Sequence, residues 1–141
     1  MSPQIRTRDP RSRAAYAASI GPAARAVVMA VAESSKPLQQ VATRPAVHAA
    51  DPRAALAAAV QLRQAQRQVD QALATYIAWC LVGGITRSAV ARALGIRPAS
   101  LDRLLAPVAD LAAARGEDLN PGADGCWRVN RMGFGGEGAA R

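Results

Sequence analysis

The sequence predicts an all-α fold: a small three- to four-helix bundle that contains a helix-turn-helix, with disordered N- and C-terminal tails. A long central segment has apolar residues at steps of three and four, and two shorter amphipathic segments follow it around a glycine. Proline and glycine are frequent elsewhere. We expect a basic, mostly disordered arm and linker at 1–50, a helical domain at 51–115 and a Gly-rich flexible tail at 116–141.

Composition limits the size of the core. Half of the 141 residues are hydrophobic, but many of these are alanines, and aromatic residues make up only 4% of the chain. Alanine buries little apolar area, so the core must be small. The length suits one modest domain plus tails.

The positive charge is concentrated in two places. The net charge is +8, and residues 83–106 carry four arginines against one aspartate, as do residues 1–13. Residues 107–141 are slightly acidic, with four arginines against five acids. This placement favours a polyanionic partner, although the charge also serves solubility. The heavy use of arginine and alanine is typical of a high-GC bacterial genome.

The chemistry-bearing side chains do not form a catalytic or metal-binding pattern. Cys80 and Cys126 have no CxxC or Cys/His companions, and His48 is the only histidine. We expect no enzyme activity, no metal and no cofactor, and a reducing, cytoplasmic location. The longest uncharged stretch, 71–86, has 16 residues. A membrane span needs about 20 apolar residues, so we expect no membrane partner.

The first 50 residues contain one candidate helix. Residues 1–20 are basic and contain Pro3 and Pro10, which favours disorder. Residues 22–34 can form a short helix, because Pro22 suits the first helical position. The next prolines, up to residue 52, indicate a linker.

A long helix is predicted from Pro52 to about Val82, with Asp51 as its cap. Its apolar positions follow nearly a seven-residue repeat: Leu62, Ala65, Val69, Ala72, Tyr76 and Trp79. Two interpretations remain open. The stripe is the seam of a homodimer through residues 52–82, or it is the buried face of the first helix of a bundle.

Two short helices and a fragment follow. Thr86 can cap a helix from Arg87 to Leu94, Gly95 can end it in a left-handed conformation, and Pro98 can open the next helix. A further short helix is predicted at 110–114. The small Ala91 and the flexible Gly95 are what a helix-turn-helix needs at its crossing and its turn. Apolar residues fall at the positions that lock the crossing angle: Val90, Leu94, Ile96, Leu101 and Leu104.

The segment TRSAVARALGIRPASLDRLL, at 86–105, resembles the helix-turn-helix of bacterial regulators related to sigma-factor region 4 and to resolvase-type modules. Their pattern is TRxxIAxALGVSxxTVxRxL. With the preceding helix, the resemblance covers 62–106, about a third of the chain. It implies a DNA-binding transcriptional regulator, from a high-GC bacterium or its mobile element, whose helix 98–106 docks in the major groove of double-stranded DNA. The location would then be the nucleoid.

The resemblance also implies the contact residues. The base-reading candidates are Ser100, Asp102 and Arg103, beside Pro98 and Ala99. The phosphate candidates are Thr86, Arg87, Arg92 and Arg97. The family usually has a capping Ser or Thr where this chain has Arg97. Pro98 and Ala99 stand where the family has long polar side chains that contact bases, and Asp102 is negative. We therefore expect few direct hydrogen bonds to base edges.

The tail motivates an alternative function. Residues 126–132 alternate enough for a short strand, but no hairpin partner is evident. Trp127 and Phe134 can form a docking segment for a protein partner through the C-terminal tail. In that interpretation the chain is a helical protein–protein interaction adaptor, and its helix-turn-helix is only a packing unit.

Overall fold

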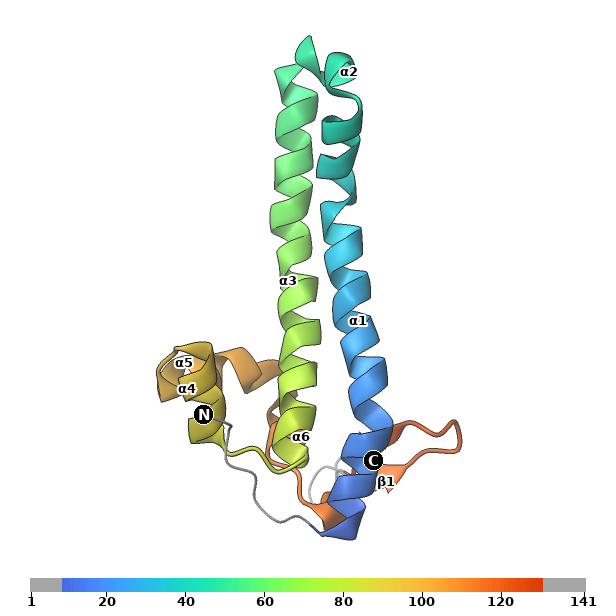
Figure 1. The fold of residues 1–141 in the computed structure, drawn as a ribbon, viewed down its shortest axis with the longest axis vertical. Coiled ribbons are helices and arrows are strands. Elements are labelled where there is room, and N and C mark those ends of the chain that lie inside the picture. Colours follow the sequence, from blue (N-terminus) through green and yellow to red (C-terminus); the bar gives the residue numbers. More distant parts are fainter. Residues whose placement is uncertain (1–8, 131–141) are drawn as a thin grey trace, which may run out of the picture. The chain divides into compact units, whose positions relative to one another are not determined.

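The computed structural model describes residues 9–130. This part of the chain is mostly helical, with one small sheet (Figure 1). Its elements are α1 Pro10–Thr43, α2 Pro45–Ala49, α3 Pro52–Val82, α4 Arg87–Leu94, α5 Pro98–Leu105, η1 Ala106–Val108, α6 Ala109–Ala112, η2 Gly116–Asp118, β1 Leu119–Pro121 and β2 Trp127–Val129.

The helix boundaries expected in the middle of the chain are confirmed. The predicted long helix is α3, Pro52–Val82, and the two predicted short helices are α4 and α5. Pro98 stands in the first turn of α5, and Gly95 ends α4 with φ +68°. These local signals were sufficient because proline at the start of a helix pre-sets φ, and glycine adopts the positive φ of a helix end without steric cost. The fragment expected at 110–114 is α6, shifted to Ala109–Ala112.

The expected disordered arm is wrong for the residues that the structure describes. Residues 10–43 form one helix, which begins with an Asp-Pro pair like the one before α3. The Asp9 carboxylate accepts hydrogen bonds from the Ser12 backbone N–H at 2.9 Å and from the Ser12 hydroxyl at 3.0 Å, so it caps α1. The helix also runs through Pro22 and Pro37. Each proline removes one helical hydrogen bond, so packing must sustain the helix there.

The expected linker at 34–52 is also mostly helical. It contains the last turns of α1 and the five-residue helix α2, Pro45–Ala49. Pro45 stands in the first turn of α2, where proline costs no hydrogen bond. The prolines in this stretch therefore mark where helices begin as well as where they are interrupted.

The described chain divides into two compact units. The hairpin unit, residues 24–73, is a helical hairpin in which the end of α1 and the start of α3 lie side by side, joined by α2 (Figure 1). Ser34 and Ala58 are buried in it, each 6% exposed. The repeating residues of α3 in this unit are half-buried: Leu62, Ala65, Val69 and Ala72.

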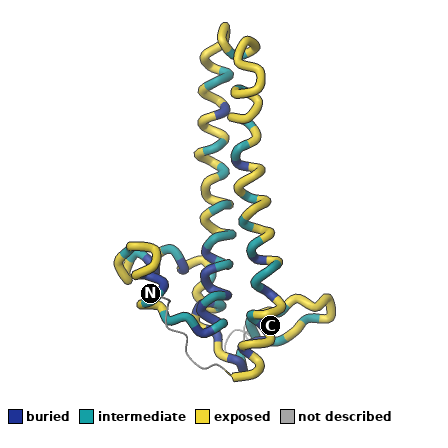
Figure 2. The backbone as a smooth tube through the Cα atoms, in the orientation of Figure 1, coloured by how far each residue is buried: buried dark blue, intermediate teal, exposed yellow. Residues whose placement is uncertain are grey.

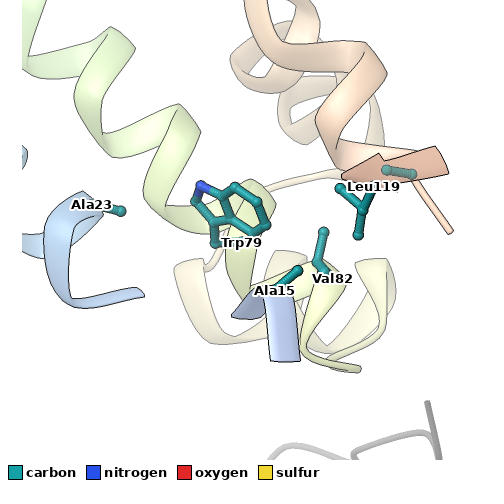
Figure 3. Packing of buried hydrophobic residues seen from close by; sticks show 6 residues of the cluster. Ala15, Ala23, Trp79, Val82 and Leu119 are labelled. Atoms are coloured by element: carbon teal, nitrogen blue, oxygen red, sulfur yellow. The ribbon is translucent and has the colours of Figure 1, made fainter. Parts of the chain in front are cut away.

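The core unit comprises residues 9–23 and 74–130. Its buried cluster joins the start of α1, the end of α3 and β1 (Figure 3). The cluster consists of Ala15, Ala23, Trp79, Val82, Ala114 and Leu119. Figure 2 shows that buried positions gather in this unit. The residues expected to lie in two disordered tails therefore supply part of the core.

The strand predicted around Trp127 is present as β2, and it has a partner. β1 pairs antiparallel with β2, with Leu119 opposite Val129 and Pro121 opposite Trp127. The expectation of a flexible tail is therefore wrong for residues 116–130, while 131–141, with Phe134, lie outside the described residues. The sequence gives no sign of this partner strand, because β1 has only three residues, too few to show an alternating pattern.

Arg11 connects the first turn of α1 to this sheet. Its Nε donates to the Leu119 carbonyl at 2.6 Å, and a terminal nitrogen donates to Oδ1 of Asn120, also at 2.6 Å. The guanidinium lies 5.7 Å from the ring centroid of Trp127, within the range of a cation–π interaction. A side chain at Gly116 would collide with the Asp9 carboxylate, so the residue before α1 lies close to the first residue of η2.

Among the described helices, α1 alone is long enough and apolar enough to cross a membrane, by length and composition only. Its most apolar 18-residue window has a mean hydropathy of 1.4. Core helices of soluble proteins and N-terminal signal sequences meet the same criterion, so this is weak evidence. In the sequence, we searched for the longest stretch without charged residues. That search did not select α1, because Arg25 lies within its apolar part.

The cap at Asp9 leads to a pH-dependent prediction. Hydrogen bonds from Ser12 hold the pKa of the Asp9 carboxyl below its ordinary value of 3.8. A carboxyl with a lowered folded-state pKa stabilises the fold above its unfolded pKa, and this stabilisation is lost as pH falls through the folded pKa. We expect Asp9→Ala to lower the urea midpoint of unfolding at neutral pH. The variant should also not show the loss of stability that protonation of Asp9 causes in the parent as pH falls.

Asp9→Asn is the matched control, since an amide oxygen can still cap the helix but does not titrate. The Asp9→Asn variant should keep most of the parent's stability at neutral pH. Like Asp9→Ala, it should not show the loss of stability that protonation of Asp9 causes in the parent at acid pH. Identical pH profiles for the three proteins, measured by urea unfolding monitored by circular dichroism, would contradict the role of this cap.

Candidate functional site

Capping hydrogen bonds define both ends of α4, the first helix of the α4–α5 pair. The Thr86 hydroxyl accepts a hydrogen bond from the Ala89 backbone N–H at 3.1 Å, as an N-cap does. At the other end the Ile96 N–H donates to the Ala91 carbonyl at 3.0 Å, around the left-handed Gly95. The turn between the two helices therefore has a fixed backbone path.

Most of the expected scaffold positions face the interior. Val90, Ala91 and Leu101 are buried, and Ile96 and Leu104 are half-buried. Leu94 is an exception, because 45% of its surface is exposed. It is the last residue of α4 and lies beside the exposed Gly95, so the turn leaves it half open to solvent. Its expected role in locking the crossing angle is not supported.

A salt bridge joins the two helices on their exposed side. A terminal nitrogen of Arg87 lies 3.1 Å from Oδ1 of Asp102, and the two side chains are 46% and 69% exposed. An exposed pair of this kind contributes about 0–1 kcal/mol to stability. Its main consequence is electrostatic. The negative charge of Asp102, which seemed unfavourable on this face, is balanced by the first turn of α4.

The other two base-reading candidates also lie together. Arg103 donates to the Ser100 hydroxyl at 3.3 Å, one turn apart on α5. Arg103 is exposed and Ser100 is half-buried. Pro98 and Ala99 are exposed but offer no side-chain hydrogen bond. The polar groups of the exposed face of α5 are therefore confined to residues 100–103.

Arg92 and Arg97 lie on either side of the Gly95 turn and are both exposed. Within residues 9–130, the side chain of neither arginine makes a hydrogen bond or a salt bridge. Arg97 stands at the N-cap position of α5, and its side chain makes no capping hydrogen bond, as expected from the absence of Ser or Thr there. Two guanidinium groups are thus left with their charge uncompensated beside the helix pair.

A depression of about 410 Å³ adjoins the N-terminus of α4. Its polar lining comes from Thr86, Arg87, Ser88 and Arg115, and its apolar lining includes Leu81 and Ile85. Sequence reasoning missed Ser88 and Arg115. Arg115 follows α6, far along the chain from α4, and only the packing of α6 brings it here.

The described residues offer little for other chemistry. Within residues 9–130, no group of three or more His, Cys, Asp or Glu side chains is placed to hold a metal ion. Burial raises the pKa of the Cys80 thiol, which disfavours the reactive thiolate. Cys126 is an exposed free thiol in the loop between β1 and β2.

No protein-family model, curated protein or solved structure matches this chain.

Gly95 gives a stability test of the turn. A Cβ at this position would meet nothing within 4 Å, so a substitution there is strained by the backbone and not by contacts. We expect Gly95→Ala to lower the free energy of unfolding by about 1–2 kcal/mol, because φ is positive. Gly95→Asn should cost less, since asparagine tolerates this conformation better. Urea unfolding measures both, and an alanine variant as stable as the parent would contradict the assigned turn.

Proposed function

We propose that this chain is a DNA-binding transcriptional regulator, from a high-GC bacterium or its mobile element, in which α4 and α5 act as a helix-turn-helix. Residues 98–106 dock in the major groove of double-stranded DNA, and the protein works at the nucleoid in the cytoplasm. The observation that carries the proposal is the pair of exposed arginines, Arg92 and Arg97, whose charge no described residue compensates. Such cations beside an exposed helix suit phosphates on both sides of a groove.

The first turn of α4 supports a further phosphate contact. Helix N-termini attract anions because their backbone N–H groups are unpaired and the helix dipole is positive there. The depression beside it adds Arg87, Arg115 and the hydroxyls of Thr86 and Ser88. A phosphate at this point would fix the register of α5 on the duplex.

The polar cluster on α5 would read bases. Arg103 can donate to O6 and N7 of guanine, and Ser100 can bond a base or phosphate. Asp102 can accept from cytosine N4 while Arg87 balances its charge. With only these three readers, specificity is expected to be modest.

A helical protein–protein adaptor remains the second candidate, and the thin reading face favours it. Pro98 and Ala99 give α5 a partly apolar exposed start. The tail gives the adaptor less support than the sequence suggested. Trp127 packs against the core cluster and beneath Arg11, and is not free to dock elsewhere in this structure.

The phosphate candidates predict a salt-dependence result. Each phosphate contact releases condensed counterions, so removing one should lower the slope of log affinity against log salt by about 1. We expect Arg92→Ala and Arg97→Ala to weaken binding alike on every DNA sequence. Arg25→Ala is the charge-matched control, because Arg25 is exposed on α1 and far from α4 in the sequence. If all three alanine variants lowered the DNA affinity equally, the binding would depend on total charge and not on the proposed site.

The base-reading candidate predicts a change in preference. Arg103→Ala should relax base selection at one position and cost about 1–3 kcal/mol there, because a bidentate contact to guanine is lost. Selection of bound fragments from a random DNA pool, for the parent and the variant, measures this. Absence of any binding at low salt would rule out the regulator and leave the adaptor as the better explanation.

A further inference from the structure

One side of α3 in the hairpin unit carries a line of exposed residues at steps of three and four. The line consists of Arg53, Leu56, Val60, Arg63 and Arg67. Residues at this spacing share one face of a helix; these five fall within about 80° of its circumference and extend over about 21 Å. Leu56 is 65% exposed and Val60 is 45% exposed. We call these five residues the α3 stripe.

The α3 stripe lies opposite the side of α3 that packs in the hairpin. That side carries the buried Ala58 and the half-buried Leu62, Ala65 and Val69. The midlines of the two sides differ by about 170° around the helix axis. The seven-residue series that suggested a homodimer through residues 52–82 therefore runs along the packed side in this unit, and the α3 stripe is a separate surface that faces solvent.

Arginine distinguishes the α3 stripe from the other exposed apolar positions of the hairpin. Val28 of α1 is 67% exposed and Val47 of α2 is 68% exposed, so exposure alone does not select α3. On α3, however, every basic residue of the helix lies on the stripe, one before the apolar pair and two after it. The single acid of α3, Asp70, lies just beyond the last of these arginines and forms no salt bridge within residues 9–130.

The positive charge of the α3 stripe is not compensated within the described chain. The side chains of Arg53, Arg63 and Arg67 make no hydrogen bond and no salt bridge in residues 9–130. The stripe thus carries a charge of +3 and no acid. A partner that covers its apolar pair must bring negative charge to both ends, because like charges in contact repel. A second copy would set arginine against arginine, so it does not fit this surface.

We propose that the α3 stripe is the docking surface for an acidic amphipathic helix of another protein. The partner helix places apolar side chains against Leu56 and Val60, and aspartates or glutamates next to the arginines. The width of the stripe supports a helical partner, because a narrow line at steps of three and four is the seam along which two helices pair. Arginine on such a seam can reach acids at its edge, since its long stem covers apolar surface while its charge stays in water.

Two other anionic surfaces fit the α3 stripe less well. Double-stranded DNA would neutralise the arginines, but its phosphates offer no apolar surface to Leu56 and Val60. An anionic bilayer would accept both kinds of side chain, but two aliphatic residues bury too little apolar area to hold a helix on a membrane. An acidic helix satisfies the charge and the apolar pair together. The contact is only about four turns long, so we expect a weak, transient complex.

A synthetic peptide tests the proposal with the full chain. The probe is a fluorescein-labelled helix of about 24 residues, long enough to be helical, with two leucines one turn apart at its centre and glutamates on both sides of them. The control peptide has lysine in place of each glutamate. We expect fluorescence anisotropy to show binding of the acidic peptide alone, with an affinity that falls as salt screens the charges. If the acidic peptide did not bind, or bound no better than the control peptide, the proposal would be overturned.

Paired substitutions locate the binding surface. Arg63→Gln with Arg67→Gln should weaken binding of the acidic peptide about tenfold, because two surface ion pairs are lost. The control for charge is Arg25→Gln with Lys36→Gln, which removes the same charge from exposed positions of α1. This control should bind the peptide like the parent. Equal weakening by the two double variants would mean that the peptide responds to total charge, and would contradict the proposed surface.

The apolar pair separates a helical partner from DNA and lipid. Leu56→Gln should also weaken peptide binding about tenfold, whereas Val28→Gln, at an equally exposed position of α1, should not. The same variants are then measured with a random-sequence DNA duplex and with phosphatidylglycerol vesicles. If the Arg63 and Arg67 substitutions weakened duplex binding as much as peptide binding, or if Leu56→Gln released the chain from vesicles, the proposal would be overturned. None of these outcomes depends on the role of α4 and α5.

Discussion

The end of α3 is the constraint on which the core unit depends. Trp79 and Val82 belong to the cluster that also receives Ala15 from α1 and Leu119 from β1 (Figure 3). In a chain this rich in alanine, one buried tryptophan supplies much of the apolar area available for packing. The glycine pair after Val82 then ends α3, and a side chain at Gly83 would press on the ring of Tyr16. The start of α4 therefore follows closely after residues that pack in the buried cluster.

The proposed site depends on this arrangement through its short connections. Three residues separate α4 from α5, and Thr86 and Gly95 define the two ends of α4. The Arg87–Asp102 pair joins the helices on the exposed side, while Val90 and Leu101 are buried beneath them. A pair of helices held in this way can present a charged surface as a rigid unit, which groove recognition requires.

The sequence was a good guide wherever one local signal determined the backbone. Pro52, Pro98 and Gly95 placed helix boundaries to the residue. It was a poor guide to α1, where the same Asp-Pro signal stands at Asp9 but Pro22 and Pro37 suggested breaks. Proline lowers helix stability by a finite amount, and tertiary packing can exceed it. Local propensity contains no information on that packing.

The candidate site divides in the same way. The sequence by itself determined the α4–α5 boundaries, the buried Val90 and Leu101, and the two exposed arginines, because periodicity and turn chemistry are local. Only the tertiary structure decided that Asp102 pairs with Arg87, that Arg115 joins the depression at α4 and that Trp127 packs beneath Arg11. These contacts join residues distant in the chain, and their partners are set by how elements pack, which residue spacing does not encode.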